Sequence, residues 1–308
     1  MIKLHITDET SVLKSVVLGT ATQLGGTPSV EEAYDPKSLE NIEKGTYPTE
    51  SDLSDEMEMF KVVMEKYGIE VFRPELLEGV HQVYARDIGF VIGDKFVVSN
   101  ILEERSKEIG GINKLLERIS ADQIIRPPQY ARIEGGDVMP WFDKIFVGYS
   151  EESDFSKYKV SRTNLAGIEF LQKTFKDHEV VPFELIKSDT HPRENALHLD
   201  CCFQPIGTND AILYRPGFKN SKDVDYLFTE FGKDHIIEID QDQMYKMASN
   251  IFSISPTTII SEKGFPRINA ELRSRGYIVE EIKYSETGKM GGLFRCSTLP
   301  LNRTNSHE

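Results

Sequence analysis

The stretch Ile88–Ser99 reads I-G-F-V-I-G-D-K-F-V-V-S. It consists of two apolar runs on either side of Gly93-Asp94, an arrangement that is typical of a β-hairpin. The same form returns in Val138–Tyr149, Cys201–Arg215 and Ile251–Ser261. The hairpins begin about 50 to 60 residues apart, and a spacing of this size indicates a repeated supersecondary unit.

Helical patterns and short strand-like pieces lie between and after the hairpins. The helical patterns cover Glu103–Ile119, Leu165–Lys176, Gln241–Ala248 and Pro266–Gly276. The strand-like pieces cover Gln123–Arg126, Glu179–Pro182, Ile236–Ile239 and Tyr277–Ile282. Each unit is therefore expected to be a hairpin, a helix and a strand, and no linker divides the chain. These units predict a closed α/β ring over residues 1–308 in a single domain, with an open α/β sheet as the alternative.

The part of the chain before the first hairpin continues this pattern. Val12–Thr20 is apolar and contains a glycine near its end, so we expect a buried first strand. Gln23–Glu50 is rich in Gly, Pro, Ser, Thr and acidic residues, and it is expected to be a surface loop. Asp52–Tyr67 has apolar residues at helical spacing. Ile69–Phe72 follows as a short strand.

Composition excludes several classes of partner. The chain has 308 residues with a net charge of −14, which disfavours nucleic acid and anionic membranes and mildly favours a cationic ligand. Solubility alone accounts for most of this charge. The first residues lack the apolar core of a signal peptide, and no apolar run reaches membrane-spanning length. Three cysteines are too few for a disulfide framework, so we expect a reducing, cytoplasmic compartment.

Chemically capable residues precede the hairpins at matching positions. Equivalent hairpin ends in a ring point to one central channel, where these residues are expected to meet. They are Arg86 and Asp87, Glu134 and Asp137, His198 and Asp200, together with Cys296 on the last strand. A single aspartate before a strand is more often a turn residue, and a free cysteine is more often a small buried hydrophobe. The set in matching positions is much more specific than any one member.

Crowded carboxylates repel one another unless a cation joins them, so the ligand is expected to be cationic. A planar guanidinium suits them best, because carboxylates bind it in bidentate fashion. A thiolate at Cys296 would attack the guanidinium carbon, and His198 would protonate the departing amine and then activate water. A metal site formed by His198, Asp200, Glu134 and Asp137 is the weaker alternative, because the usual ligand spacings are missing. No cofactor or metal is therefore expected.

The ordered motifs E-G-G-D at Glu134–Asp137, H-L-D at His198–Asp200 and G-G-L-F-R-C-S-T-L-P-L-N-R around Cys296 resemble those of the guanidino-group-modifying enzymes. This family includes arginine deiminase, dimethylarginine dimethylaminohydrolase and the amidinotransferases. The resemblance implies a five-bladed α/β propeller (the pentein fold) with pseudo-fivefold symmetry. It also implies roles for individual residues: Cys296 as nucleophile, His198 as general acid and base, Glu134 orienting His198, and Asp87 and Asp200 holding the guanidinium.

The family's R-T-[NT]-x-x-G segment is similar to Ser161–Asn164 followed by Gly167, so Arg162 inherits the role of binding a substrate carboxylate. Arg86 and Asp137 complete the expected substrate-binding set. The chain also departs from the family. Leu293 and Arg295 replace a glycine and a histidine that many members have before the cysteine, and Glu151–Val160 looks like an added segment.

The resemblance implies a hydrolase of arginine or a related guanidino compound that works through a covalent thiouronium. An amidinotransferase, in which an amine replaces the water, is the near alternative. A propeller that only binds ligands is a third reading, disfavoured because it has no need of Cys296, His198 and acids together. A small cationic guanidino compound is the expected partner, and a homodimer is left open.

Overall fold

The computed structural model describes residues 1–304, and these form five three-stranded sheets. In four sheets an antiparallel hairpin is joined by a third strand, as the sequence predicts, and the structure shows that this third strand is parallel to its neighbour. These sheets are β3 (Gly89–Ile92), β4 (Lys95–Val98) and β5 (Ile124–Ile125); β6 (Val138–Trp141), β7 (Lys144–Tyr149) and β8 (Glu179–Glu184); β9 (Phe203–Ile206), β10 (Asp210–Leu213) and β11 (Ile236–Glu238); and β12 (Phe252–Ser255), β13 (Thr258–Glu262) and β14 (Ile278–Ile282).

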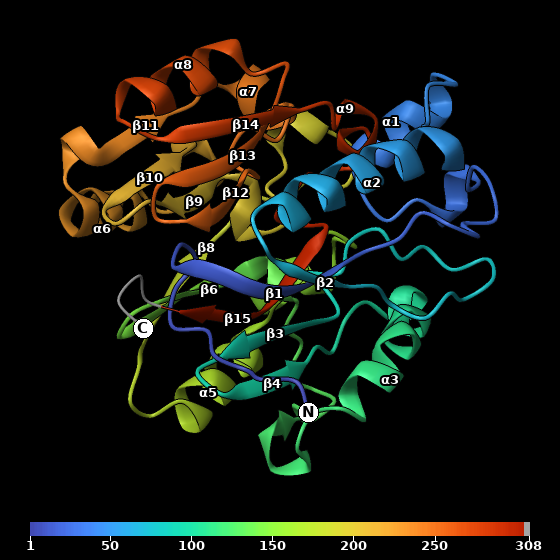
Figure 1. Ribbon diagram of the computed structural model, residues 1–308, viewed down its shortest axis with the longest axis horizontal. Helices are drawn as coiled ribbons and strands as arrows, with labels where there is room; N and C mark the ends of the chain where they lie inside the picture. Colours follow the sequence, from blue (N-terminus) through green and yellow to red (C-terminus); the bar gives the residue numbers. More distant parts are fainter. Residues whose placement is uncertain (305–308) are drawn as a thin grey trace.

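The fifth sheet joins the two ends of the chain. β1 (Val12–Leu18) lies between β15 (Thr298–Thr304), with which it is antiparallel, and β2 (Glu70–Phe72), with which it is parallel. Figure 1 shows β1 and β15 side by side in the middle of the molecule. Cys296 ends up two residues before β15 rather than on the last strand, so the expected position was wrong by that amount. A turn leaves its side chain free to face a cavity instead of a neighbouring sheet.

The helices lie around the outside of the sheets (Figure 1). They are α1 (Pro36–Glu43), α2 (Glu50–Lys66), α3 (Asn113–Leu116), α4 (Glu152–Phe155), α5 (Leu165–Thr174), α6 (Ser221–Phe231), α7 (Gln241–Tyr245), α8 (Pro266–Ser274) and α9 (Ser285–Gly288). Within residues 1–304, none has the length and apolar character needed to cross a bilayer.

Three helical expectations need correction. Glu103–Ile112 forms 3₁₀ turns rather than the start of a long α-helix, since two glycines at 110 and 111 interrupt it. The helix α6 was missed, although Val224, Leu227 and Phe231 form its buried face at helical spacing. The expected surface loop at 23–50 contains α1, which begins at a capping aspartate, Asp35.

Helix α2 supports the segment that carries Cys296. Thr49 and Asp52 form a capping box at its start, where each side chain bonds the other residue's backbone N–H. Its buried face includes Phe60, whose ring meets Phe294 edge-on at a centroid distance of 5.1 Å. Because Phe294 is two residues before Cys296, core packing fixes the backbone of the expected nucleophile.

Candidate active site

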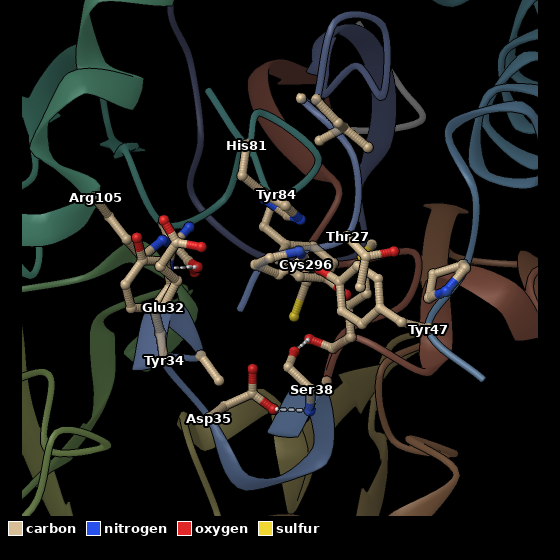
Figure 2. Close-up of a pocket in the computed structure, with 18 of the residues that line it drawn as sticks. Thr27, Glu32, Tyr34, Asp35, Ser38, Tyr47, His81, Tyr84, Arg105 and Cys296 are labelled. Atoms are coloured by element: carbon tan, nitrogen blue, oxygen red, sulfur yellow. Dashed lines mark hydrogen bonds and ion pairs between the residues drawn. The ribbon is translucent and has the colours of Figure 1, made fainter. Parts of the chain in front are cut away.

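One cavity of about 460 Å³ contains both Cys296 and His198 in its wall. This volume fits a small metabolite. Asp87 and Arg162 also line it, so four of the residues expected at the site face a shared space. Figure 2 shows the sulfur of Cys296 pointing into the middle of this cavity. Glu134 and Asp200 do not line the cavity; they contact His198 and Cys296, respectively, from inside the protein.

Cys296 is held by an asparagine that sequence reasoning did not assign to the site. The amide nitrogen of Asn250 donates to the sulfur at 3.1 Å, while its oxygen accepts from the backbone N–H groups of Cys296 and Leu293, each at 3.0 Å. The thiol donates to Asp200 Oδ2 at 3.4 Å. Burial, together with the charges of Asp200 and Asp87, raises the pKa of Cys296 well above its ordinary value. The thiol is therefore protonated before a ligand binds.

The glycine before this turn allows a close approach. A side-chain carbon at Gly292 would lie 2.6 Å from the ring of Tyr84 and 2.8 Å from Cβ of Cys296. Tyr84 lines the cavity and donates its hydroxyl to the carbonyl of Thr287 at 2.9 Å. The second glycine of the G-G-L-F-R-C motif is thus required by the close packing between Cys296 and the ring of Tyr84.

His198 lies between two carboxylates. Its Nε2 is 2.9 Å from Glu134 Oε2, and its Nδ1 is 3.7 Å from Asp87 Oδ1. Burial alone lowers the pKa of His198, but Asp87, Asp137 and Glu134 outweigh it and raise the pKa above 6.5. A protonated imidazole is therefore favoured, as a general acid requires. The second glycine of E-G-G-D is also required by close packing, since a side-chain carbon at Gly136 would lie 2.6 Å from the imidazole of His198.

Arg105 also lines the cavity, although no motif in the sequence marks it. It donates to both oxygens of Glu108 at 2.7 and 2.8 Å and to Asp87 Oδ2 at 2.8 Å. Burial raises the pKa of Glu108 to about 7, although Arg105 opposes the shift. Asp87 Oδ1 is left buried and accepts no hydrogen bond from residues 1–304, so this oxygen is available to a ligand.

Asp87, Glu134 and His198 have ligand atoms within 4.8 Å of one another, which is compatible with a metal ion. These groups already have cationic partners, however. Arg105 contacts Asp87, and the Nη1 of Arg162 lies 3.1 Å from Glu134. Since guanidinium groups already compensate these carboxylates, the cluster does not need a metal ion to balance its charge.

Arg162 links the catalytic groups to the loop that covers them. Its Nη1 donates to Glu134, its Nη2 to the carbonyl of Tyr34 at 2.9 Å, and its Nε to the carbonyl of Lys159 at 3.0 Å. All three nitrogens are therefore engaged within the protein. The expected contact with a substrate carboxylate would use only the N–H groups that these bonds leave over.

Arg295 is buried and neutralises Asp200. It binds both oxygens of Glu9 at 3.0 and 3.1 Å and Asp200 Oδ2 at 2.8 Å. Burial raises the pKa of Glu9, but Arg295 and then Arg86 reverse the shift and lower it to about 2. This buried ion pair network keeps Asp200 in place behind the sulfur.

Three expected substrate-binding residues, Arg86, Asp137 and Asp200, lie outside the cavity wall, which corrects the expectation that they face the ligand. Arg86 is buried with its Nε donating to the carbonyl of Arg295 and its Nη1 3.7 Å from Glu9. Asp137 is fully buried and accepts the backbone N–H of Leu199 at 3.0 Å.

Comparison with known proteins gives matches over most of the chain. A family model described as N,N dimethylarginine dimethylhydrolase, eukaryotic, matches residues 38–303. The uncharacterized protein YkgA of Bacillus subtilis is 33% identical over 244 residues, which are 78% of this chain and 77% of YkgA. The uncharacterized protein ZK1307.1 of Caenorhabditis elegans is 28% identical over 248 residues, 78% of this chain and 80% of that protein.

Solved structures share the fold at lower identity. The amidinotransferase SxtG from Microseira wollei has a TM-score of 0.77 at 16% identity, covering 99% of this chain and 98% of its own. The N-terminal domain of ArgZ, a cyanobacterial arginine dihydrolase, has a TM-score of 0.77 at 20% identity, and the match covers 94% of this chain and 98% of the ArgZ chain. The inosamine-phosphate amidinotransferase StrB1 of Streptomyces griseus has a TM-score of 0.74 at 15% identity, and the match covers 99% of this chain and 98% of the StrB1 chain. With the five sheets, these likenesses confirm the five-bladed propeller, and the open sheet is excluded.

Proposed function

Because the chain belongs to the N,N-dimethylarginine dimethylhydrolase family of guanidino-modifying enzymes, we propose that it hydrolyses arginine or a related guanidino compound through a covalent intermediate on Cys296. One observation carries this proposal: the thiol of Cys296 and the imidazole of His198 face the same cavity, with Asp87 beside them, whose Oδ1 accepts no hydrogen bond from residues 1–304. A nucleophile, an acid–base group and an anion for a cationic substrate are the parts that such a reaction needs.

Binding prepares the nucleophile. A guanidinium group that reaches Asp87 brings a positive charge toward a thiol whose pKa is raised by burial and by neighbouring carboxylates. A cation close to sulfur favours the thiolate and so lowers that pKa. The hydrogen bond from Asn250 to the sulfur stabilises the thiolate further, because donors to an ionised sulfur bind more strongly than donors to a neutral thiol. Activation of Cys296 therefore depends on the substrate.

The first half of the reaction forms the intermediate. The thiol of Cys296 releases its proton to solvent as the substrate cation binds. The sulfur then attacks the central guanidinium carbon, and the bond from that carbon to the departing amine breaks. The amine takes its proton from His198, whose raised pKa keeps the imidazole protonated at the start. The product is a thiouronium on Cys296, and His198 is left neutral with Glu134 orienting its ring.

In the second half, neutral His198 takes a proton from a water molecule as the water oxygen attacks the thiouronium carbon. The carbon–sulfur bond then breaks as the hydroxyl of the intermediate becomes a carbonyl and its proton passes to the sulfur. A ureido product leaves, and Cys296 and His198 return to their starting states. In the amidinotransferase alternative, the alkylamine part of the substrate departs in the first half, and an amine takes the place of water in the second. Amidinotransferases share this fold, so the alternative is retained.

The test combines labelling with product analysis. A haloacetamidine should label Cys296 in the wild type and not in Cys296→Ala, whereas Cys201→Ala, which removes a cysteine outside this cavity, should be labelled normally. Incubation with L-arginine, its N-methylated forms and 4-guanidinobutylamine should yield a ureido product without an added amine. Product that forms only when an amine is added would replace hydrolysis by transfer, and turnover by Cys296→Ala would eliminate both.

A further inference from the structure

Resting on this proposed function, we propose that Asp35 is a specificity-determining residue that binds an ammonium group at the end of the substrate distal to its guanidino group. The substrate class is therefore an aminoalkyl guanidine, a compound with two separate positive charges. Asp35 lines the same cavity as Cys296 but belongs to the loop that covers it.

The charge of the cavity wall supports two cationic ends. Among residues 1–304 the carboxylates that line it are Glu32, Asp35, Glu50 and Asp87, and the arginines are Arg105 and Arg162. The hydrogen bonds described above already pair both arginines with acids. His81 adds no positive charge, because burial lowers its pKa to about 3. The acidic groups of the wall are thus not balanced by free cations.

Asp35 has one oxygen free for a ligand. Its Oδ1 caps helix α1 by accepting the backbone N–H groups of Lys37 at 3.0 Å and Ser38 at 2.9 Å. Its Oδ2 accepts no hydrogen bond from residues 1–304. In Figure 2 one oxygen of Asp35 joins Ser38 and the other points into the cavity, on the same side as Cys296. The ammonium of Lys37 is directed elsewhere, to the carbonyl of Tyr245.

The two carboxylates divide the recognition of the substrate. Asp87 is 3% exposed with an unpaired oxygen beside His198, so it suits the guanidinium that must reach the catalytic groups. Asp35 is held by the helix cap next to Gly291, where Oδ1 would lie 3.0 Å from an added side-chain carbon. Because the cap fixes the Asp35 carboxylate, a substrate ammonium meets it without loss of side-chain freedom.

The experiment uses two matched pairs of guanidines with the full-length protein. L-Arginine differs from 5-guanidinopentanoate, and 4-guanidinobutylamine from butylguanidine, only by an amino group. In each pair we expect the amino compound to have a kcat/KM higher by about tenfold, as a charge-assisted hydrogen bond provides. Asp35→Asn, which keeps an N-cap side chain, should reduce this preference to about twofold, mainly through KM. Glu31→Gln, on an exposed residue outside the cavity wall, should leave it unchanged.

The outcomes separate this inference from the proposed function. Equal kcat/KM values within both pairs, or an unchanged preference in Asp35→Asn, would overturn the role of Asp35 while leaving hydrolysis intact. If mass spectrometry finds no thiouronium adduct on Cys296 with any of the four guanidines, the proposed function and the inference are lost together. Retention of the preference in Glu31→Gln but not in Asp35→Asn would support the assignment.

Discussion

Asn250→Asp isolates the contact between the asparagine and the nucleophile. The substitution keeps the size of the side chain and an oxygen for the N–H groups of Cys296 and Leu293. It removes the amide nitrogen that lies 3.1 Å from the sulfur. Reactivity should therefore change while the turn around Cys296 persists.

The magnitude follows from the nature of the lost bond. A hydrogen bond to an ionised group contributes about 1.5–3 kcal/mol, so kcat/KM should fall by about 10- to 150-fold. A carboxylate at position 250 would also place a negative charge beside the thiolate, which raises the pKa of Cys296 further. The loss should therefore lie toward the upper end of this range.

Steady-state kinetics and the pH dependence of haloacetamidine labelling measure the effect. Labelling of Asn250→Asp should become slower and shift to higher pH. The matched control is Asn269→Asp, because Asn269 is also buried and donates to a carbonyl, that of Glu262, at 2.9 Å, but lies outside the cavity wall. The control should lower thermal stability without changing labelling. Values of kcat/KM and labelling within twofold of wild type in Asn250→Asp would refute the reasoning.

Three further variants test the supports of the site. Gly136→Ala puts a carbon 2.6 Å from the His198 ring, so kcat should fall at least tenfold while circular dichroism stays native; unchanged kcat would contradict this contact. Glu134→Gln removes a carboxylate that raises the pKa of His198, so the loss of kcat with rising pH should begin at lower pH, and an unmoved alkaline limb would count against the pairing. Arg295→Met leaves buried Asp200 without its cationic partner and Glu9 with Arg86 alone, and urea denaturation should show a loss of about 3–5 kcal/mol; a loss below 1 kcal/mol would argue that the network is unimportant.

The titration of His198 also sets how the site affects stability. The pKa of His198 in the folded protein lies above 6.5, its ordinary value in an unfolded chain. Protonation of His198 therefore stabilises the folded state fully at pH values below the unfolded-state pKa. This stabilisation is lost as the pH rises through the folded-state pKa. The raised pKa of Cys296 has a different consequence, because a protonated thiol is neutral whereas a protonated imidazole is charged. The resting site therefore combines a protonated acid with a protonated nucleophile, and a cationic substrate is needed to ionise the sulfur.

Local patterns in the sequence predicted much of the fold. Hairpins such as Ile88–Ser99 are recognisable because a turn and its two apolar strands are neighbours in the chain. The helix α6 could also have been found, since Val224, Leu227 and Phe231 recur at helical spacing. The 3₁₀ segment Glu103–Ile112 was wrongly predicted as α-helix. Glycines such as Gly110 and Gly111 disfavour an α-helix only weakly, so tertiary packing decides whether the helix forms.

The sequence by itself determined that the chain is a ring of repeated α/β units and that Cys296, His198, Glu134 and several acids belong to one site, because each unit presents its motif at an equivalent position. Only the tertiary structure decided which acids face the cavity. It also revealed Arg105, which no motif marks, and the contact made by Asn250, whose signal in the sequence is its place directly before the hairpin Ile251–Ser261. The physical reason is that the polar contacts of the site join residues far apart in the chain: the Arg295–Glu9 pair is separated by 286 positions, and no local pattern encodes such a partner.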